Sequence, residues 1–200
     1  MKKIIFALTL SLIIGMASSA FAELPLLFTI LDSEYGLGNW IQVPAGMDQI
    51  WYNSGSITSY AEAKYASWSQ RFGYIDGTGF HPLLPRVTGN GDLNGIPSRT
   101  LSATPGYIRL ADRVKSGTYT WSSLVSENTD TYDHMWTYKI TGGNYTGDYV
   151  VGWEDTSGGG DNDHNDFVVR LRGASPVPEP ATMLLLGLGI LGLAKFRRKK

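Results

Sequence analysis

Residues 153–172, WEDTSGGGDNDHNDFVVRLR, are the stretch that most limits how this chain can fold. Carboxylates crowded on one loop repel one another, so the folded loop needs a counter-charge or full solvation. The closing residues, FVVRLR, alternate as a strand does. The segment therefore predicts an acidic loop, organised by a cation with oxygen ligands, that leads into a strand. Its carboxylates belong to Glu154, Asp155, Asp161, Asp163 and Asp166.

The oxygen spacing within this loop is typical of calcium binding. Asp161, Asp163 and Asn165 lie two residues apart, as ligands do in D-x-D-x-D loops. An EF-hand is not indicated, because Asp166 occupies its glycine position and Arg172 occupies its closing glutamate position. The alternative is a solvated turn in which Asp and Asn are only turn formers. We expect calcium, held by Glu154, Asp155, Asp161, Asp163, Asn165 and Asp166.

A second segment has similar oxygen spacing but lacks a closing ligand. Asn90, Asp92 and Asn94 lie two residues apart and are followed by Gly95, whereas Leu101 occupies the twelfth place. Asn and Gly readily form turns without an ion. We therefore interpret this segment as a turn, with an ion loop as the alternative.

Composition and charge restrict the class of protein. The chain of 200 residues allows one core domain plus targeting signals. All 18 acidic residues lie between Glu23 and Glu179, while seven of the 17 basic residues lie near the two ends, so the central region carries a formal charge of about −8. This sign disfavours a nucleic-acid partner. The absence of cysteine excludes disulfides, thiolate metal sites and a cysteine nucleophile.

The first 22 residues have the pattern of a secretory signal peptide. Two lysines precede an apolar run over residues 4–16, and Ala20 and Ala22 give the small-x-small pattern that signal peptidase recognises. The mature chain is expected to begin at Glu23. The alternative is a retained membrane anchor, which the short apolar run disfavours.

Short strand signals separated by turn residues predict an all-β domain over residues 23–173. A helical stripe precedes them at residues 25–35, and residues 61–74 fit either a helix or a strand, with a strand favoured. Residues 74–98 indicate a long excursion rich in turn formers. The fold class expected is a β-sandwich or jelly roll with a short N-terminal helix. Later strands are expected at residues 107–110, 117–124, 132–140, 149–154 and 167–172.

The last of these strands has an apparent inside and outside. Phe167, Val169 and Leu171 are expected to face the core. Arg170 and Arg172 alternate with them and are expected to face water.

The C-terminal region resembles a sorting signal. Residues 174–180 form a Pro-rich linker, residues 181–194 are apolar, and residues 195–200 are basic and expected to stay cytoplasmic. This order, with Val177, Pro178, Glu179 and Pro180 at the junction, is similar to the PEP-CTERM signal of Gram-negative bacteria that make exopolysaccharide. The resemblance implies export, transient anchoring in the inner membrane by residues 181–194, and processing near the VPEP sequence by an exosortase. The alternative is a plain transmembrane anchor. Fourteen apolar residues are fewer than the roughly 20 that span a bilayer, which disfavours this alternative.

Residues 152–167 carry a second resemblance. Their WED sequence, followed by GGGDNDHNDF, is similar to a WED...GGGDxDxND motif in a family of secreted domains of unknown function, over about residues 106–172. His164 occupies a variable place of that motif. The resemblance implies a secreted location and a β-fold more than an activity.

The sequence favours a non-enzymatic role. A glycosidase needs two carboxylates about 5–9.5 Å apart across a sugar, whereas most acids here lie on one loop. Neither a G-x-S-x-G elbow nor a zinc spacing of histidines occurs. We expect a cell-envelope or extracellular-matrix protein with no catalytic role. The alternative is a calcium-dependent module that binds glycan or exopolysaccharide through some of its six Trp and 11 Tyr, although aromatic residues also fill such cores.

Overall fold

A computed structural model describes residues 26–177 of the chain. The predicted signal peptide with Ala20 and Ala22 lies outside the described residues. So do Pro178, Glu179 and Pro180, the apolar segment 181–194 and the basic end 195–200. Among the described residues, no helix has the length and apolar character needed to cross a bilayer.

One short helix and a set of antiparallel strands make up the domain, which confirms the predicted fold class. The predicted N-terminal helix is present as α1 (Leu27–Tyr35). The strands are β1 (Trp40–Gln42), β2 (Ile50–Lys64), β3 (Gln70–Asp76), β4 (Gly79–Pro82), β5 (Gly91–Asp92), β6 (Ser98–Ser102), β7 (Gly106–Val114), β8 (Tyr119–Ser122), β9 (Met135–Ile140), β10 (Tyr149–Trp153) and β11 (Phe167–Val177).

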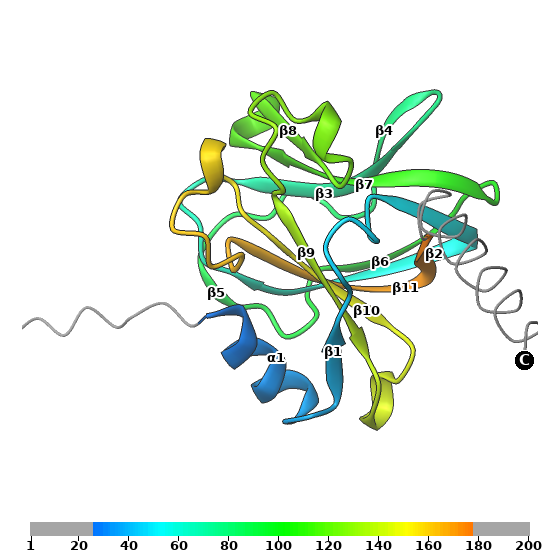
Figure 1. The fold of residues 1–200 in the computed structure, drawn as a ribbon, viewed down its shortest axis with the longest axis vertical. Helices are drawn as coiled ribbons and strands as arrows, with labels where there is room; N and C mark the ends of the chain where they lie inside the picture. Colours follow the sequence, from blue (N-terminus) through cyan, green and yellow to red (C-terminus); the bar gives the residue numbers. More distant parts are fainter. Residues whose placement is uncertain (1–25, 178–200) are drawn as a thin grey trace, which may run out of the picture.

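The strands form a folded sheet of two layers. The strand order is β1-β9-β10-β11-β2-β7-β3-β4, with β5 and β6 paired to β2 and β8 paired to β7. The beginning of β7 pairs with β2, while β7 also pairs with β3 along most of its length, so it connects the layers. Figure 1 shows β3, β4, β7 and β8 in one layer above β9, β10, β11, β2 and β6. The architecture is therefore a β-sandwich.

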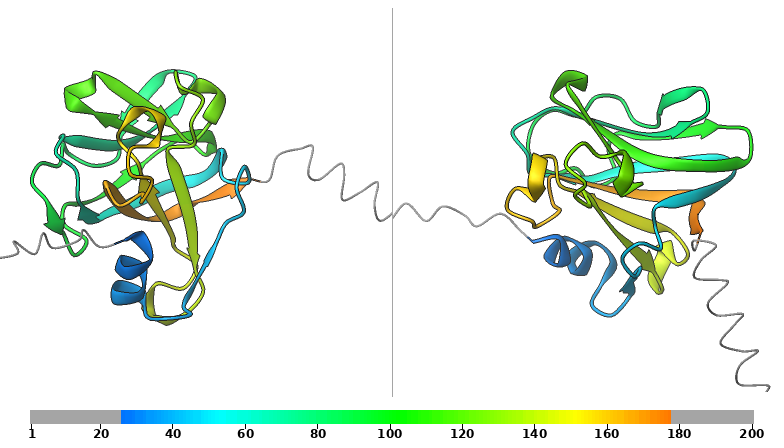
Figure 2. Two further views of the ribbon diagram at one scale, coloured as in Figure 1. Left: turned by 60° about the vertical axis from the view of Figure 1, so that its left-hand side comes forward. Right: turned by 45° about the horizontal axis from the view of Figure 1, so that its top comes forward.

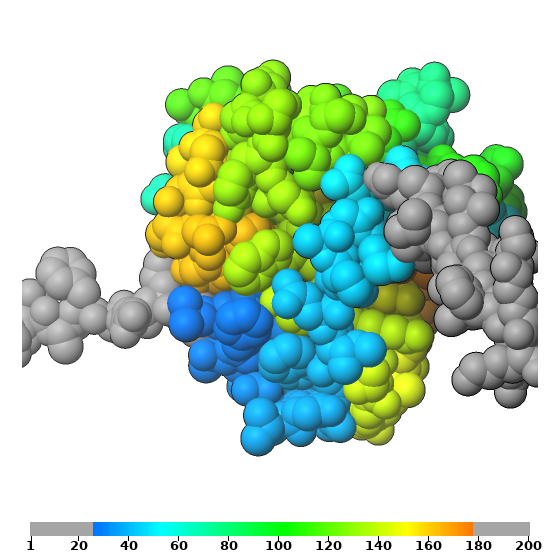
Figure 3. All heavy atoms as spheres, viewed as in Figure 1, coloured from blue at the N-terminus to red at the C-terminus, as the bar shows by residue number. Residues whose placement is uncertain are grey.

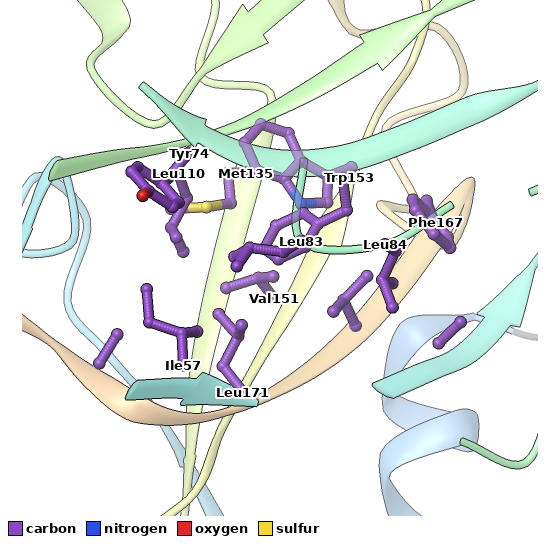
Figure 4. Close-up of a cluster of buried hydrophobic side chains, with 14 of the residues drawn as sticks. Ile57, Tyr74, Leu83, Leu84, Leu110, Met135, Val151, Trp153, Phe167 and Leu171 are labelled. Atoms are coloured by element: carbon purple, nitrogen blue, oxygen red, sulfur yellow. The ribbon is translucent and has the colours of Figure 1, made fainter. Parts of the chain in front are cut away.

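The main core fills the space between the two layers. Figure 4 shows Met135, Val151 and Trp153 meeting side chains that come from the opposite layer and from the β4–β5 connection. Trp153 and Phe167, which flank the acidic loop, are both fully buried. Val151 and Trp153 lie two residues apart on β10, so both side chains point to the same face of the strand. The acidic loop is therefore anchored at both ends in the core.

A second, smaller core lies on the outer face of β9, β10 and β11. Helix α1 packs there through Leu27, Ile30, Leu31 and Tyr35, which lie at helical spacing. Figure 2 shows α1 against the outside of this layer. Both faces of the three strands are consequently buried, so alternation alone cannot distinguish inside from outside here.

The prediction that Arg170 faces water is wrong. Arg170 is only 5% exposed and forms ion pairs with Glu62 and Asp148. The rings of Tyr60 and Tyr145 lie 3.9 and 4.1 Å from its guanidinium carbon. Its side chain lies on the face that α1 helps to cover, which explains the difference. By contrast, the Arg172 side chain is 55% exposed, as predicted.

Strand β11 is longer than the sequence predicted. It continues to Val177, into the segment expected to be a linker from residue 174, because its last residues pair with residues 50–53 of β2. A bulge at Gly173 makes this possible. Gly173 has φ +86°, and a β-carbon there would collide with the Ser56 carbonyl.

Residues 61–74 and the following excursion are more ordered than predicted. The ambiguous segment contains the end of β2 and the beginning of β3, separated by a loop at residues 65–69, so the strand interpretation is confirmed except in that loop. The excursion contains β4 and β5. The strand expected at 132–140 begins only at Met135, because turns precede it.

Candidate metal centre

The acidic loop comprises residues 154–166 and connects β10 to β11. Pairing of Trp153 with Phe167 closes the base of the loop. Figure 1 shows the loop at one end of the sandwich, while β11 ends at the other. In Figure 3 the gold loop lies at the surface beside the green segment around residues 120–135.

The loop brings the predicted carboxylates together in two groups. Glu154, Asp161 and Asp163 each offer an oxygen, and these oxygens lie within 4.8 Å of one another. Glu154, Asp155 and Asp166 form a second group that meets the same limit. Glu154 therefore belongs to both groups and is the centre of the cluster.

Glu154 is buried with an unsatisfied oxygen. Its residue is 1% exposed, and its Oε2 has no hydrogen-bond partner among the described residues. Burial raises the pKa of Glu154, a side-chain contact with the Asp166 carboxyl lowers it, and the negative charges of Asp161 and Asp163 raise it further. An isolated buried carboxylate oxygen costs free energy unless a donor or a cation reaches it. The arrangement therefore fits a bound cation.

Hydrogen bonds position Asp155 and Asp166. Asp155 accepts hydrogen bonds from Gln70 Nε2 at 2.8 Å and from Thr156 Oγ1 at 3.1 Å. Its backbone N–H donates to Asp166 Oδ2 at 2.8 Å. Burial raises the pKa of Asp166, and the charges of Asp155 and Glu154 add to the shift. These hydrogen bonds fix the orientation of both carboxylates.

Asp163 is held by its neighbour. Asn165 donates its backbone N–H to Asp163 Oδ1 at 3.1 Å and its side-chain amide to Asp163 Oδ2 at 2.6 Å. Asn165 thus orients Asp163, and its own role as a ligand stays a prediction. Asp161 is exposed at the rim of the loop.

The cluster opens into a cleft of about 410 Å³. The opposite wall comes from the β2–β3 loop and includes Tyr65 and Trp68. The Trp68 ring is already in contact with other side chains, because Tyr119 stacks on it and Lys115 Nζ lies 5.0 Å from its centroid. The cleft is thus lined by carboxylates and by two aromatic residues, of which Trp68 also packs against Tyr119.

Two buried charged residues that interact with the acidic loop were not predicted from the sequence as part of the site. Lys64 is 1% exposed, and its Nζ donates to the Ala66 carbonyl at 2.5 Å and to Asn90 Oδ1 at 3.3 Å. Asp112 is fully buried, and burial raises its pKa to about 8. Asp112 and Lys64 are distant in sequence from the loop, so no local motif indicates them. Their only sequence signal is a charge within a strand-like run.

A stacked aromatic pair supports the beginning of the loop. Trp121 lies 3.8 Å from His134, centroid to centroid, and its Nε1 donates to the Asp155 carbonyl at 2.8 Å. His134 is 2.7 Å from the Glu154 carbonyl through Nδ1 and 3.0 Å from Asp130 Oδ2 through Nε2. These contacts hold the backbone at Glu154 and Asp155 in place.

The other two histidines also have structural contacts. His164 stacks on Trp136 at 4.0 Å, and burial lowers its pKa to about 4, so it is neutral. His81 contacts Asp76 at 3.0 Å on the β3–β4 hairpin. These contacts indicate structural roles for both histidines.

The second oxygen-rich segment contains the short strand β5, which pairs with β2, followed by a turn at residues 94–95. Asp92 accepts a hydrogen bond from the Tyr65 hydroxyl at 2.6 Å, and Asn90 accepts one from Lys64. Asn94 and Gly95 have φ values of +51° and +78°, which are typical of turns. The side chains of Asn90 and Asp92 are thus occupied by protein contacts, in agreement with the turn interpretation.

Comparison with known families covers most of this region and the tail. Residues 176–199 match the PEP-CTERM protein-sorting motif, which confirms that resemblance. Residues 77–174 match a domain of unknown function, DUF4114. This match contains the acidic loop, but its description names no activity, and the proposed kinship with secreted WED...GGGDxDxND domains stays a prediction. No curated protein matches the sequence.

The sorting motif defines the class of protein to which the chain is similar. It indicates an exported protein that passes the inner membrane to the cell envelope or extracellular space and is processed by an exosortase. This protein is thus a β-sandwich with an acidic loop at the beginning of β11 and a sorting motif that starts at the end of β11.

Proposed function

We propose that this protein is a non-enzymatic component of the cell envelope or extracellular matrix whose acidic loop is stabilised by calcium. The observation that carries the proposal is the buried Oε2 of Glu154, which has no partner among the described residues and belongs to two groups of converging carboxylates. All the side-chain atoms offered are carboxylate oxygens. Hard oxygen ligands in this number favour calcium over softer metals.

A structural role is supported by how the carboxylates are arranged. Within each group the oxygens lie within 4.8 Å of one another, whereas glycosidase carboxylates stand about 5–9.5 Å apart on the two sides of a sugar. Asp155 and Asp163 also accept hydrogen bonds, from Gln70 and from Asn165 respectively. Such an arrangement favours holding an ion over transferring protons.

The position of the loop also supports a role at the envelope surface. Strand β11 begins at the acidic loop and ends at Val177, within the first residues of the sorting motif at 176–199. Eleven residues at about 3.3 Å each separate the two ends by roughly 30 Å. A domain held by its tail would therefore present the loop away from the attachment point.

Thermal unfolding tests the calcium proposal. We expect calcium to raise the melting temperature of the purified protein, because an ion that binds only the folded state stabilises it by RT ln(1 + [L]/Kd), about 2.7 kcal/mol at a hundredfold excess over Kd. Asp161→Ala combined with Asp163→Ala should reduce this increment, because it removes two of the carboxylates that converge with Glu154. Asp76→Ala, on a distant hairpin, is the matched control and should retain it. An unchanged calcium response of the double variant would contradict the proposal.

A second candidate function is calcium-dependent binding of glycan or exopolysaccharide. The observation that favours it is the cleft, because Tyr65 and Trp68 line it together with the carboxylates. An ion at the rim could bind sugar hydroxyls beside these rings. Tyr107, which is 69% exposed, offers an aromatic ring near the far end of β11, because it pairs with Tyr52, which in turn pairs with Ser175.

A pull-down on the exopolysaccharide of the producing cell, with and without EDTA, separates this function from a purely structural one. Calcium-dependent retention that Trp68→Ala removes and Tyr107→Ala preserves would support glycan binding in the cleft. Retention in neither condition would leave only the structural role. Retention lost in Tyr107→Ala alone would place the glycan at the opposite end.

A further inference from the structure

We propose that the acidic loop holds two divalent cations bridged by Glu154, an inner ion with Asp155 and Asp166 and an outer ion with Asp161 and Asp163. The inference rests on the proposed calcium-stabilised loop and goes beyond it in stoichiometry and ligand assignment. Its basis is that the two groups of carboxylates share this single residue.

The geometry of Glu154 suits a bridging ligand. It is 1% exposed and lines the cleft, and its Oε2 has no partner among the described residues. Gly160 lies against the other oxygen, Oε1, because a β-carbon at that position would overlap it. A carboxylate that joins two ions uses both of its oxygens, and the ions of such sites lie about 3.5–4 Å apart. Within each of the two groups that share Glu154, the ligand oxygens lie within 4.8 Å of one another.

The local charge distinguishes one ion from two. Lys64 is buried and interacts electrostatically with Asp155 and Asp166. Burial raises the pKa of Asp112 to about 8, so this carboxyl is largely protonated at pH 7 and adds little charge. The five loop carboxylates, ionised as ion binding requires, and Lys64 give a formal charge of −4. One divalent ion would leave −2 in a largely buried cluster, whereas two would leave 0. Uncompensated buried charge is costly, so the second ion is favoured.

The two positions differ in how they are built. The inner group is nearly buried, and the backbone N–H of Asp155 fixes Asp166 Oδ2. The outer group has an exposed Asp161 and a half-buried Asp163 that Asn165 orients. We therefore expect the outer ion to exchange faster and to be the first removed by a chelator.

Ion counting tests the proposal. Native mass spectrometry of the metal-stripped protein titrated with calcium alone should show two bound ions, and calorimetry should give the same number. Asp161→Asn should retain only the inner ion and Asp166→Asn only the outer one, since each amide keeps the shape but removes the charge. Asp76→Asn, which lies on the β3–β4 hairpin, should still bind two ions.

Each outcome decides between the hypotheses. One ion in the unaltered protein, lost in both Asp161→Asn and Asp166→Asn, would overturn the two-ion site and retain the calcium-stabilised loop. No ion at any concentration would overturn both. Circular dichroism identifies a variant that fails to fold, and in that case the number of ions in the unaltered protein and in the other variant gives the answer.

Discussion

Gly160 lies directly against the carboxylate of Glu154, so that a β-carbon at position 160 would overlap Oε1. Gly160 also has φ +45° and ψ −121°, a backbone conformation that residues with a β-carbon rarely adopt. The loop can therefore pass over the buried carboxylate only because residue 160 has no side chain. This contact gives the GGG sequence a role beyond flexibility.

Gly160→Ala should disrupt the acidic loop. We expect a loss of about 1–3 kcal/mol in the free energy of unfolding and a weaker calcium response, because the new methyl displaces Glu154. Gly158→Ala is the matched control, since Gly158 has φ +77° and nothing within 4 Å of its added β-carbon. Urea unfolding and calcium titration measure the two effects. Equal calcium affinity in the two variants would show that the Glu154 contact is unimportant.

Trp121→Phe should weaken calcium binding from a distance. The substitution removes the hydrogen bond from Nε1 to the Asp155 carbonyl, and leaving that buried acceptor unpaired costs about 1–3 kcal/mol. Trp51→Phe is the control, because Trp51 is equally buried and donates to the Asp48 carbonyl. Both variants should be less stable in urea, but only Trp121→Phe should need more calcium for half-saturation. The same calcium dependence in both would contradict a supporting role for Trp121.

Sequence reasoning located the acidic loop well because its information is local. The strand signals of β10 and β11 predicted where the loop begins and ends, and the density of carboxylates predicted five side chains that the fold brings together in two groups. The helix α1 was equally predictable from its spacing of Leu and Ile. These features depend on neighbours within a few positions, which a single sequence displays directly.

What the sequence could not reveal depends on contacts between distant segments. Lys64, Gln70 and Asp112 reach the loop only because β2, β3 and β7 lie beside it in the folded sheet. Arg170 was assigned to water because its strand alternates, yet the outer face of that strand is covered by α1 and its surroundings. Burial on both faces removes the contrast that alternation requires.

The pH dependence of stability should change in Asp112→Asn. Burial raises the pKa of Asp112 to about 8 in the folded protein, above its ordinary value of about 3.9, so the folded state binds more protons between these values. Stability in the presence of a chelator should therefore fall as pH rises from 5 to 8, by at most about 1.4 kcal/mol per pH unit for this group. The asparagine variant should lose that part of the slope.

Asp112→Asn retains the acceptor for the Arg71 N–H, so folding is expected to persist. Asp92→Asn, at an exposed position, is the control and should keep the full slope. Urea unfolding at pH 5, 6.5 and 8 gives the three slopes. A variant with the same slope as the unaltered protein would show that Asp112 does not contribute to it.

Arg170→Ala should be far more destabilising than Arg172→Ala, although the two residues are near neighbours on β11. Arg170 neutralises the buried carboxylates of Glu62 and Asp148, and its removal should cost about 3–5 kcal/mol because it leaves buried charge unpaired. Arg172 also binds Asp148, but its side chain is 55% exposed, so its loss should cost at most about 1 kcal/mol. Urea unfolding at pH 7 compares them, and similar losses would mean that the Arg170 network is solvated in solution.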